Sequence, residues 1–106
     1  MPSPPREFHP TASGVDFADL AWAVPESDGG QPITEYVVER RDVTKSAYVR
    51  VGVTKADTLV IKATKLTEKS QYLFRVAAVN SAGQSEWAEL KEPVTAKQPF
   101  DPPGLI

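Results

Sequence analysis

Apolar and polar residues alternate along most of this 106-residue chain, which is the period of a β-strand and not of a helix. In the strongest run, residues 71–79, one face carries Tyr72, Phe74 and Val76 while the other carries Arg75. The chain also contains ten prolines, and a proline inside a helix costs about 3 kcal/mol. The alternation and the prolines together predict an all-β fold.

The alternating runs are short, and turn residues separate them. The predicted strands cover residues 6–10, 15–23, 35–42, 48–52, 58–64, 71–79 and a last stretch within 84–96. Pro10 is expected to break the first strand, and Asn80–Gly83 is expected to form a hairpin turn. Most runs have one apolar and one polar face, as in an antiparallel sheet. About seven such strands predict a seven-stranded antiparallel β-sandwich, and a barrel of the same strand count is the alternative.

The prolines are concentrated at the two ends of the chain. Six of the ten lie there: Pro2, Pro4, Pro5, Pro99, Pro102 and Pro103. Proline fixes φ and stiffens extended linkers between modules. We therefore predict an N-terminal linker over residues 1–5, one domain over 6–97, and a linker to a following module over 98–106.

Composition excludes several classes of chemistry. The chain has no cysteine, which removes disulfides, thiolate zinc sites and cysteine nucleophiles. Its only histidine is His9, in a proline-flanked segment that is poorly suited to a catalytic triad. The net charge of −2 is unlike that of a nucleic-acid binder, and no apolar run approaches the roughly 20 residues of a membrane span. We expect no catalytic residue, no cofactor and no metal site, and neither a nucleic-acid nor a membrane partner.

Several residues in separate predicted strands resemble the fibronectin type III family. Trp22 resembles the buried tryptophan of the second strand, and Tyr36 with Val38 resembles the inward pair of the third. Leu66, six residues before Tyr72, resembles the tyrosine corner, in which the phenol hydroxyl bonds back to the upstream chain. The resemblance implies an immunoglobulin-like sandwich with these structural core residues: Trp22, Tyr36, Leu66, Tyr72, Phe74 and Val76.

A narrower resemblance is to the modules of giant muscle proteins such as titin, twitchin and myosin-binding protein C. It is carried by the segments 28–33, 36–42, 80–83, 93–97 and 101–104. It implies a non-catalytic spacer and docking module in a tandem array, located in the cytoplasm, in the sarcomere and there in the A-band. The implied partners are neighbouring immunoglobulin or fibronectin type III modules and myosin or other thick-filament proteins. An extracellular adhesion or receptor module is the alternative.

Three residues are candidates for partner binding, namely Trp87, Arg40 and Arg41. Trp87 stands where the muscle subclass usually has proline; it is either an exposed anchor or a structural residue packed near Arg75. The Arg40–Arg41 pair could contact an acidic partner. The alternative for the pair is a solvated cross-strand ion-pair face with the neighbouring carboxylates Glu35, Glu39 and Asp42.

Overall fold

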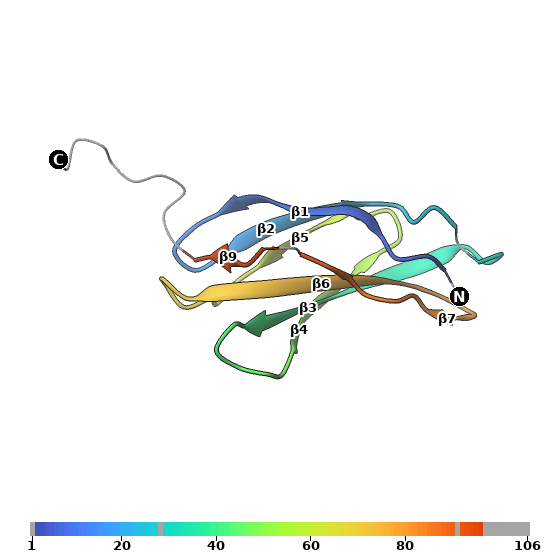
Figure 1. The fold of residues 1–106 in the computed structure, drawn as a ribbon. Coiled ribbons are helices and arrows are strands. Elements are labelled where there is room, and N and C mark those ends of the chain that lie inside the picture. Colours follow the sequence, from blue (N-terminus) through green and yellow to red (C-terminus); the bar gives the residue numbers. More distant parts are fainter. Residues whose placement is uncertain (1, 28, 91, 97–106) are drawn as a thin grey trace.

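The computed structural model describes residues 2–27, 29–90 and 92–96, and these form a sandwich of two antiparallel sheets (Figure 1). The smaller sheet has the order β1-β2-β5, and the larger has β4-β3-β6, with three short strands on the far side of β6. The strands are β1 Arg6–Ser13, β2 Ala18–Ala23, β3 Ile33–Asp42, β4 Val49–Lys55, β5 Val60–Ala63, β6 Gln71–Asn80, β7 Gly83–Gln84, β8 Ala88–Glu89 and β9 Val94–Thr95.

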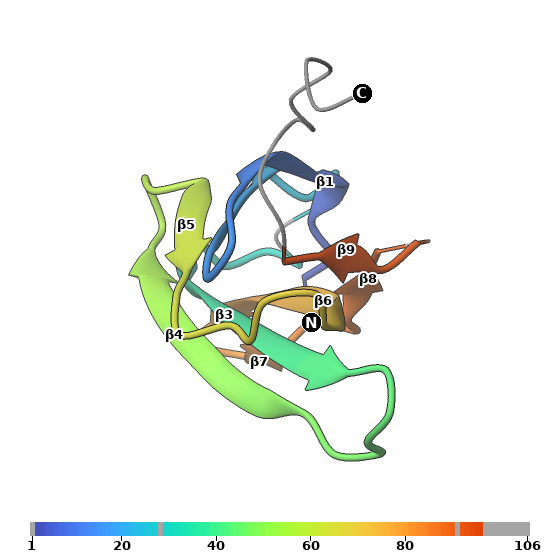
Figure 2. The ribbon, with the colours of Figure 1, turned by 90° about the vertical axis from the view of Figure 1, so that its left-hand side faces the viewer.

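The last three strands behave as one interrupted strand. β7, β8 and β9 each pair antiparallel with β6, at successive positions along its length. Counted together they make the seventh strand of the sandwich. The fold is therefore the predicted all-β sandwich and not the barrel, since β4 and β5 are the edge strands of two separate sheets (Figure 2).

The first strand differs from the sequence prediction, which ended it at Pro10. β1 continues to Ser13, and its pairing with β2 shifts register between Arg6 and His9 and again between Pro10 and Ala12. Proline cannot donate a ladder hydrogen bond, so it is tolerated on edge strands and at bulges. β1 is an edge strand, and this is why Pro10 shifts the register instead of ending the strand.

The core lies between the sheets and is filled by alternate residues of the central strands. In β2 every second residue is buried, and β6 buries most of its length. The six residues expected in the core are all at most 5% exposed. Trp22 packs edge-on against Phe8 and tilted against Tyr36, at centroid distances of 6.1 and 5.5 Å. Aromatic pairs favour such offset geometries, and these three rings join β1, β2 and β3.

The tyrosine corner is formed as the sequence predicted. The backbone N–H of Thr67 donates a hydrogen bond of 2.8 Å to the hydroxyl of Tyr72. The Nε1 of buried Trp22 has no hydrogen-bond partner among the described residues. The tryptophan is held by ring packing, because the aromatic rings of Phe8 and Tyr36 surround it.

The N-terminal residues 2–5 belong to the part of the chain that the structure describes, whereas the residues after 96 do not. Pro2 and Pro5 are buried, and the backbone N–H of Ser3 donates to the carbonyl of Ser27 at 2.8 Å. The proposed C-terminal linker over residues 98–106 lies outside the described residues. The domain boundaries therefore stay predictions.

Candidate functional site

A row of alternating charge crosses the outward face of the larger sheet. Backbone register places Glu39 on β3 opposite both Arg50 on β4 and Arg75 on β6. Arg75 in turn lies opposite Glu89 on β8. Directly opposed side chains of opposite charge stabilise a sheet. The strand pairing thus builds one arginine–glutamate–arginine–glutamate row from four strands.

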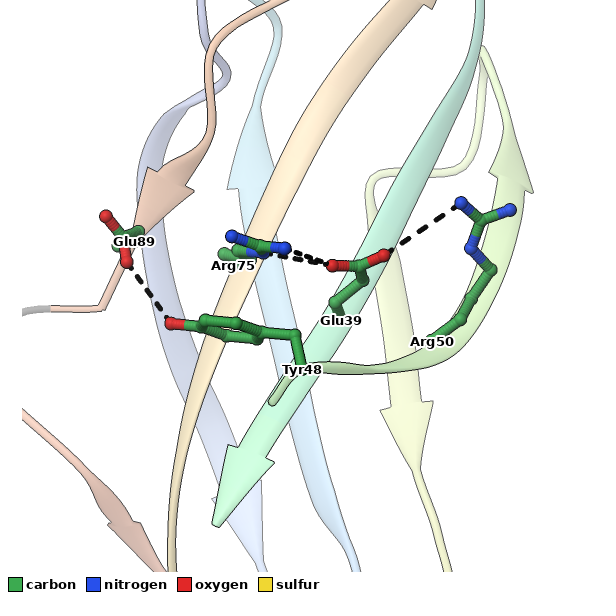
Figure 3. A network of polar contacts seen from close by, with 5 residues as sticks. All are labelled: Glu39, Tyr48, Arg50, Arg75 and Glu89. Atoms are coloured by element: carbon green, nitrogen blue, oxygen red, sulfur yellow. Dashed lines mark hydrogen bonds and ion pairs between the residues drawn. The ribbon is translucent and has the colours of Figure 1, made fainter. Parts of the chain in front are cut away.

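The centre of this row is the ion pair between Arg75 and Glu39 (Figure 3). Nε of Arg75 donates to Oε1 of Glu39 at 3.0 Å, and Nη2 donates to the same oxygen. Arg50 approaches the other carboxylate oxygen at 3.9 Å, and its side chain is 59% exposed. The side chains of Glu39 and Arg75 are only 15% and 24% exposed. Partial burial reduces solvent screening, so the Arg75–Glu39 pair contributes more than the Arg50–Glu39 pair.

Two aromatic rings contact the same guanidinium, and we call Tyr48, Arg75 and Trp87 the arginine stack. Cζ of Arg75 lies 3.7 Å from the ring centroid of Tyr48 and 4.1 Å from that of Trp87. The Tyr48 hydroxyl donates to Oε1 of Glu89 at 3.2 Å (Figure 3). Cation–π attraction and the ion pair together hold the guanidinium in one position. A half-buried Trp87 is thereby fixed at the surface of the sheet.

The structure separates the two adjacent arginines that the sequence suggested as one basic patch. Arg41 belongs to the outward face, where its Cζ lies 5.7 Å from the Tyr48 ring and its Nη1 donates to the carbonyl of Lys45. Arg40 points the other way, with its Cζ 5.4 Å from the Tyr72 ring. Successive residues of a strand face opposite sides, so Arg40 and Arg41 serve different surfaces.

A cross-strand ion-pair face is present and includes Glu39, one of the three carboxylates named for it, but its arginines are Arg50 and Arg75 and not Arg40 or Arg41. Glu39 pairs with Arg75 and Arg50. Sequence reasoning missed Arg50, Tyr48 and Glu89 as parts of this surface, because their proximity depends on which strands are neighbours. The sequence did offer one signal, the alternation of strand faces. It places Glu39, Arg41 and Arg75 at outward positions of their strands.

Two ionisable groups near Arg40 have shifted pKa values. Hydrogen bonds from the side chain and the backbone N–H of Thr44 lower the pKa of Asp42 below 3.8, and Lys45 and Arg40 add to the effect. Burial tends to raise the pKa of Tyr72, but the hydrogen bond from Thr67 and the charge of Arg40 lower it overall. Hydrogen bonds that favour the ionised form explain both directions.

The outward face carries residue types that are common in protein interfaces. Within residues 2–27, 29–90 and 92–96, no three histidine or acidic side chains gather as metal ligands would. In the same part of the chain no helix is long and apolar enough to cross a membrane. What the face does offer is a fixed tryptophan beside tyrosine and arginine, the three residue types most enriched at the energetic centres of protein interfaces.

Comparison with known proteins agrees with this architecture. The model of the fibronectin type III domain matches residues 3–94. Titin of Drosophila melanogaster is 39% identical over 97% of this chain, and the fast-type myosin-binding protein C of Mus musculus is 35% identical over 81%. The chain spans only 1% and 8% of those two proteins.

A solved structure shows the same likeness in three dimensions. The crystal structure of domains A168–A170 from titin superimposes with a TM-score of 0.85 at 36% identity, over 92% of this chain and 33% of that one. The family match extends over nearly all of the two-sheet sandwich, from β1 into β9. The chain is a non-catalytic module and belongs to the fibronectin type III family.

Proposed function

We propose that this module is a spacer and docking unit in the tandem array of a giant muscle protein, in the A-band of the sarcomere. Support comes from the relatives, which are titin and myosin-binding protein C at 35–39% identity. The chain corresponds to a small fraction of each, as one module of an array would. Its neighbours in the chain would be further immunoglobulin or fibronectin type III modules.

The docking surface that we propose is the outward face of the larger sheet, with the arginine stack at its centre. The observation that carries this proposal is Arg75 held between Tyr48 and Trp87. A side chain that is already fixed loses little entropy when a partner covers it. The charge row beside the stack presents both signs, so it fits a partner surface of alternating charge such as that of a coiled-coil rod.

Binding to the myosin rod tests the docking proposal. We expect Trp87→Ala to weaken capture of the 106-residue chain by immobilised myosin rod at least about tenfold, which is the effect of losing a central interface aromatic. The matched control is Val60→Ala, because Val60 is 57% exposed but lies on β5 of the other sheet. Unfolding of both variants is measured in parallel. Loss of stability without loss of binding would leave Trp87 as a structural residue only.

Mechanical extension tests the spacer proposal. A tandem protein of several copies of this module, pulled from its ends, should extend in discrete steps. Each step corresponds to cooperative opening of one sandwich, since the β2–β5 and β3–β6 ladders join strands distant in sequence. A smooth extension at the same contour length would contradict the spacer role.

A further inference from the structure

The charge of Arg40 acts on the nearby carboxylate of Asp42, but the two groups form no ion pair within 4 Å. Among the described residues the guanidinium of Arg40 makes no hydrogen bond and no ion pair within 4 Å, and its Nη1 is buried without a partner. Its Cζ lies 5.4 Å from the ring centroid of Tyr72. A desolvated guanidinium nitrogen without an acceptor is unfavourable. Because Arg40 also lines two cavities, the rest of its guanidinium is placed to gain from an anion supplied from outside the domain.

Arg40 lies in the wall between two adjacent cavities at one open side of the sandwich. The first, of about 240 Å³, is lined by Arg40, Arg50, Val51, Lys62, Thr64 and Lys65. The second, of about 160 Å³, adds Lys45, Asp42 and Thr67, and again includes Arg40 and Lys65. They lie beside β4 and β5, the two edge strands that Figure 2 shows on the same side of the molecule.

Positive charge gathers at this side although the whole chain is slightly acidic. Five of the twelve lysines and arginines line the two cavities, against a net charge of −2 for the chain. The described lining has one carboxylate, Asp42, which accepts hydrogen bonds from the N–H and hydroxyl of Thr44. Of the cations, Arg50 faces Glu39 at 3.9 Å, and Lys62 lies over the ring of Phe17. Arg40 and Lys65, which are common to both cavities, form no ion pair within 4 Å among the described residues.

We propose that Arg40 and Lys65 form a binding site for a phosphorylated serine or threonine side chain of a protein partner. A phosphate carries close to two negative charges and three acceptor oxygens, which suits a guanidinium fork beside an ammonium. The cavities have room for one such group, and the cations form a compact cluster instead of the long basic stripe of a nucleic-acid site. The free edges of β4 and β5 can align an extended peptide, so a phosphopeptide is favoured over an oligonucleotide.

A titration with a minimal probe tests this site. The ¹⁵N-labelled 106-residue chain is titrated with a capped pentapeptide, phosphoserine flanked by two glycines on each side, and with the same peptide carrying serine. We expect amide shifts centred on Arg40, Lys65 and Thr67, with the phosphorylated peptide binding at least about tenfold more tightly. Raising the salt concentration should weaken binding, because the contact is electrostatic.

Two variants and one matched control distinguish phosphopeptide binding at this site from nonspecific electrostatic attraction to the domain. Arg40→Gln should weaken phosphopeptide binding about tenfold, and Lys65→Asn should weaken it as well. Asparagine tolerates the left-handed backbone found at Lys65, where φ is 61°, so this variant keeps the fold. Arg41→Gln removes the same charge one residue away on the opposite face and should have no effect. Equal losses in Arg40→Gln and Arg41→Gln, indistinguishable binding of the two peptides, or tighter Arg40-dependent binding of a single-stranded oligonucleotide would overturn the proposal.

Discussion

Tyr72→Phe removes one hydroxyl from the tyrosine corner, and its cost follows from the structure. The hydroxyl accepts a hydrogen bond of 2.8 Å from the backbone N–H of Thr67. A hydrogen bond of this kind contributes about 1 kcal/mol net, and more when its loss leaves a buried partner unsatisfied. Tyr72 is 5% exposed, but Thr67 is exposed, so water can satisfy the freed N–H in part. We expect a loss of about 1–2 kcal/mol in the free energy of unfolding.

Tyr36→Phe is the matched control, because it deletes the same atom in a different environment. Tyr36 is fully buried, and its hydroxyl has no hydrogen-bond partner among the described residues. Removing an unpaired buried hydroxyl costs no hydrogen bond and removes a desolvation penalty. We expect this variant to be as stable as the wild type or more stable, by up to about 1 kcal/mol.

Urea unfolding measures both variants on the same scale. The fluorescence of Trp22, which is 5% exposed, should report the loss of the core. The slope of unfolding free energy against urea should not change, since the surface exposed on unfolding is nearly the same. For a domain of this size a loss of 1–2 kcal/mol also lowers Tm by roughly 5–15 °C. Equal losses in the two variants, or no loss in Tyr72→Phe, would refute the assignment of the stabilising hydrogen bond.

Three further predictions follow from single contacts. Arg75→Lys should destabilise the domain by about 1 kcal/mol in urea unfolding, because an ammonium lacks the planar guanidinium that stacks on Tyr48 and Trp87 and donates to Glu39 from two nitrogens; an unchanged midpoint would contradict this. Hydrogen bonds from Thr44 lower the pKa of Asp42 in the folded state below its ordinary 3.8, so its charge stabilises the fold above that pH and stops doing so as the pH falls through the lowered pKa. The stability difference between wild type and Asp42→Ala should thus be full at pH 7 and shrink below pH 3.8, and a constant difference down to pH 2 would argue against the shift. Gly14→Ala should cost about 1–3 kcal/mol, since its Cβ would overlap the ring of Phe17; Gly52→Ala, whose Cβ would lie 3.3 Å from Ile61, should cost less.

Much of the fold could be predicted from local pattern alone. The alternation in residues 71–79 identified β6, and Asn80 to Gly83 forms the expected turn, in which Oδ1 of Asn80 accepts from the N–H groups of Ala82 and Gly83. The tyrosine corner was also predictable, because its hydrogen bond joins Thr67 and Tyr72, which lie close together in the sequence. The end of β1 was not, because the effect of Pro10 depends on β1 being an edge strand.

The sequence by itself determined the all-β class of the fold, because the period-2 spacing of apolar residues is a local property of the chain. The main core residues and the family followed from the resemblance to fibronectin type III domains. Only the tertiary structure decided which surface residues act together. Strand pairing places four charged residues in one row, namely Arg50, Glu39, Arg75 and Glu89. Because successive residues of a strand face opposite sides, Arg40 and Arg41 lie on opposite faces of the sheet. Contacts between strands depend on the order and register of the sheet, and residues distant in sequence become neighbours only when that register is set.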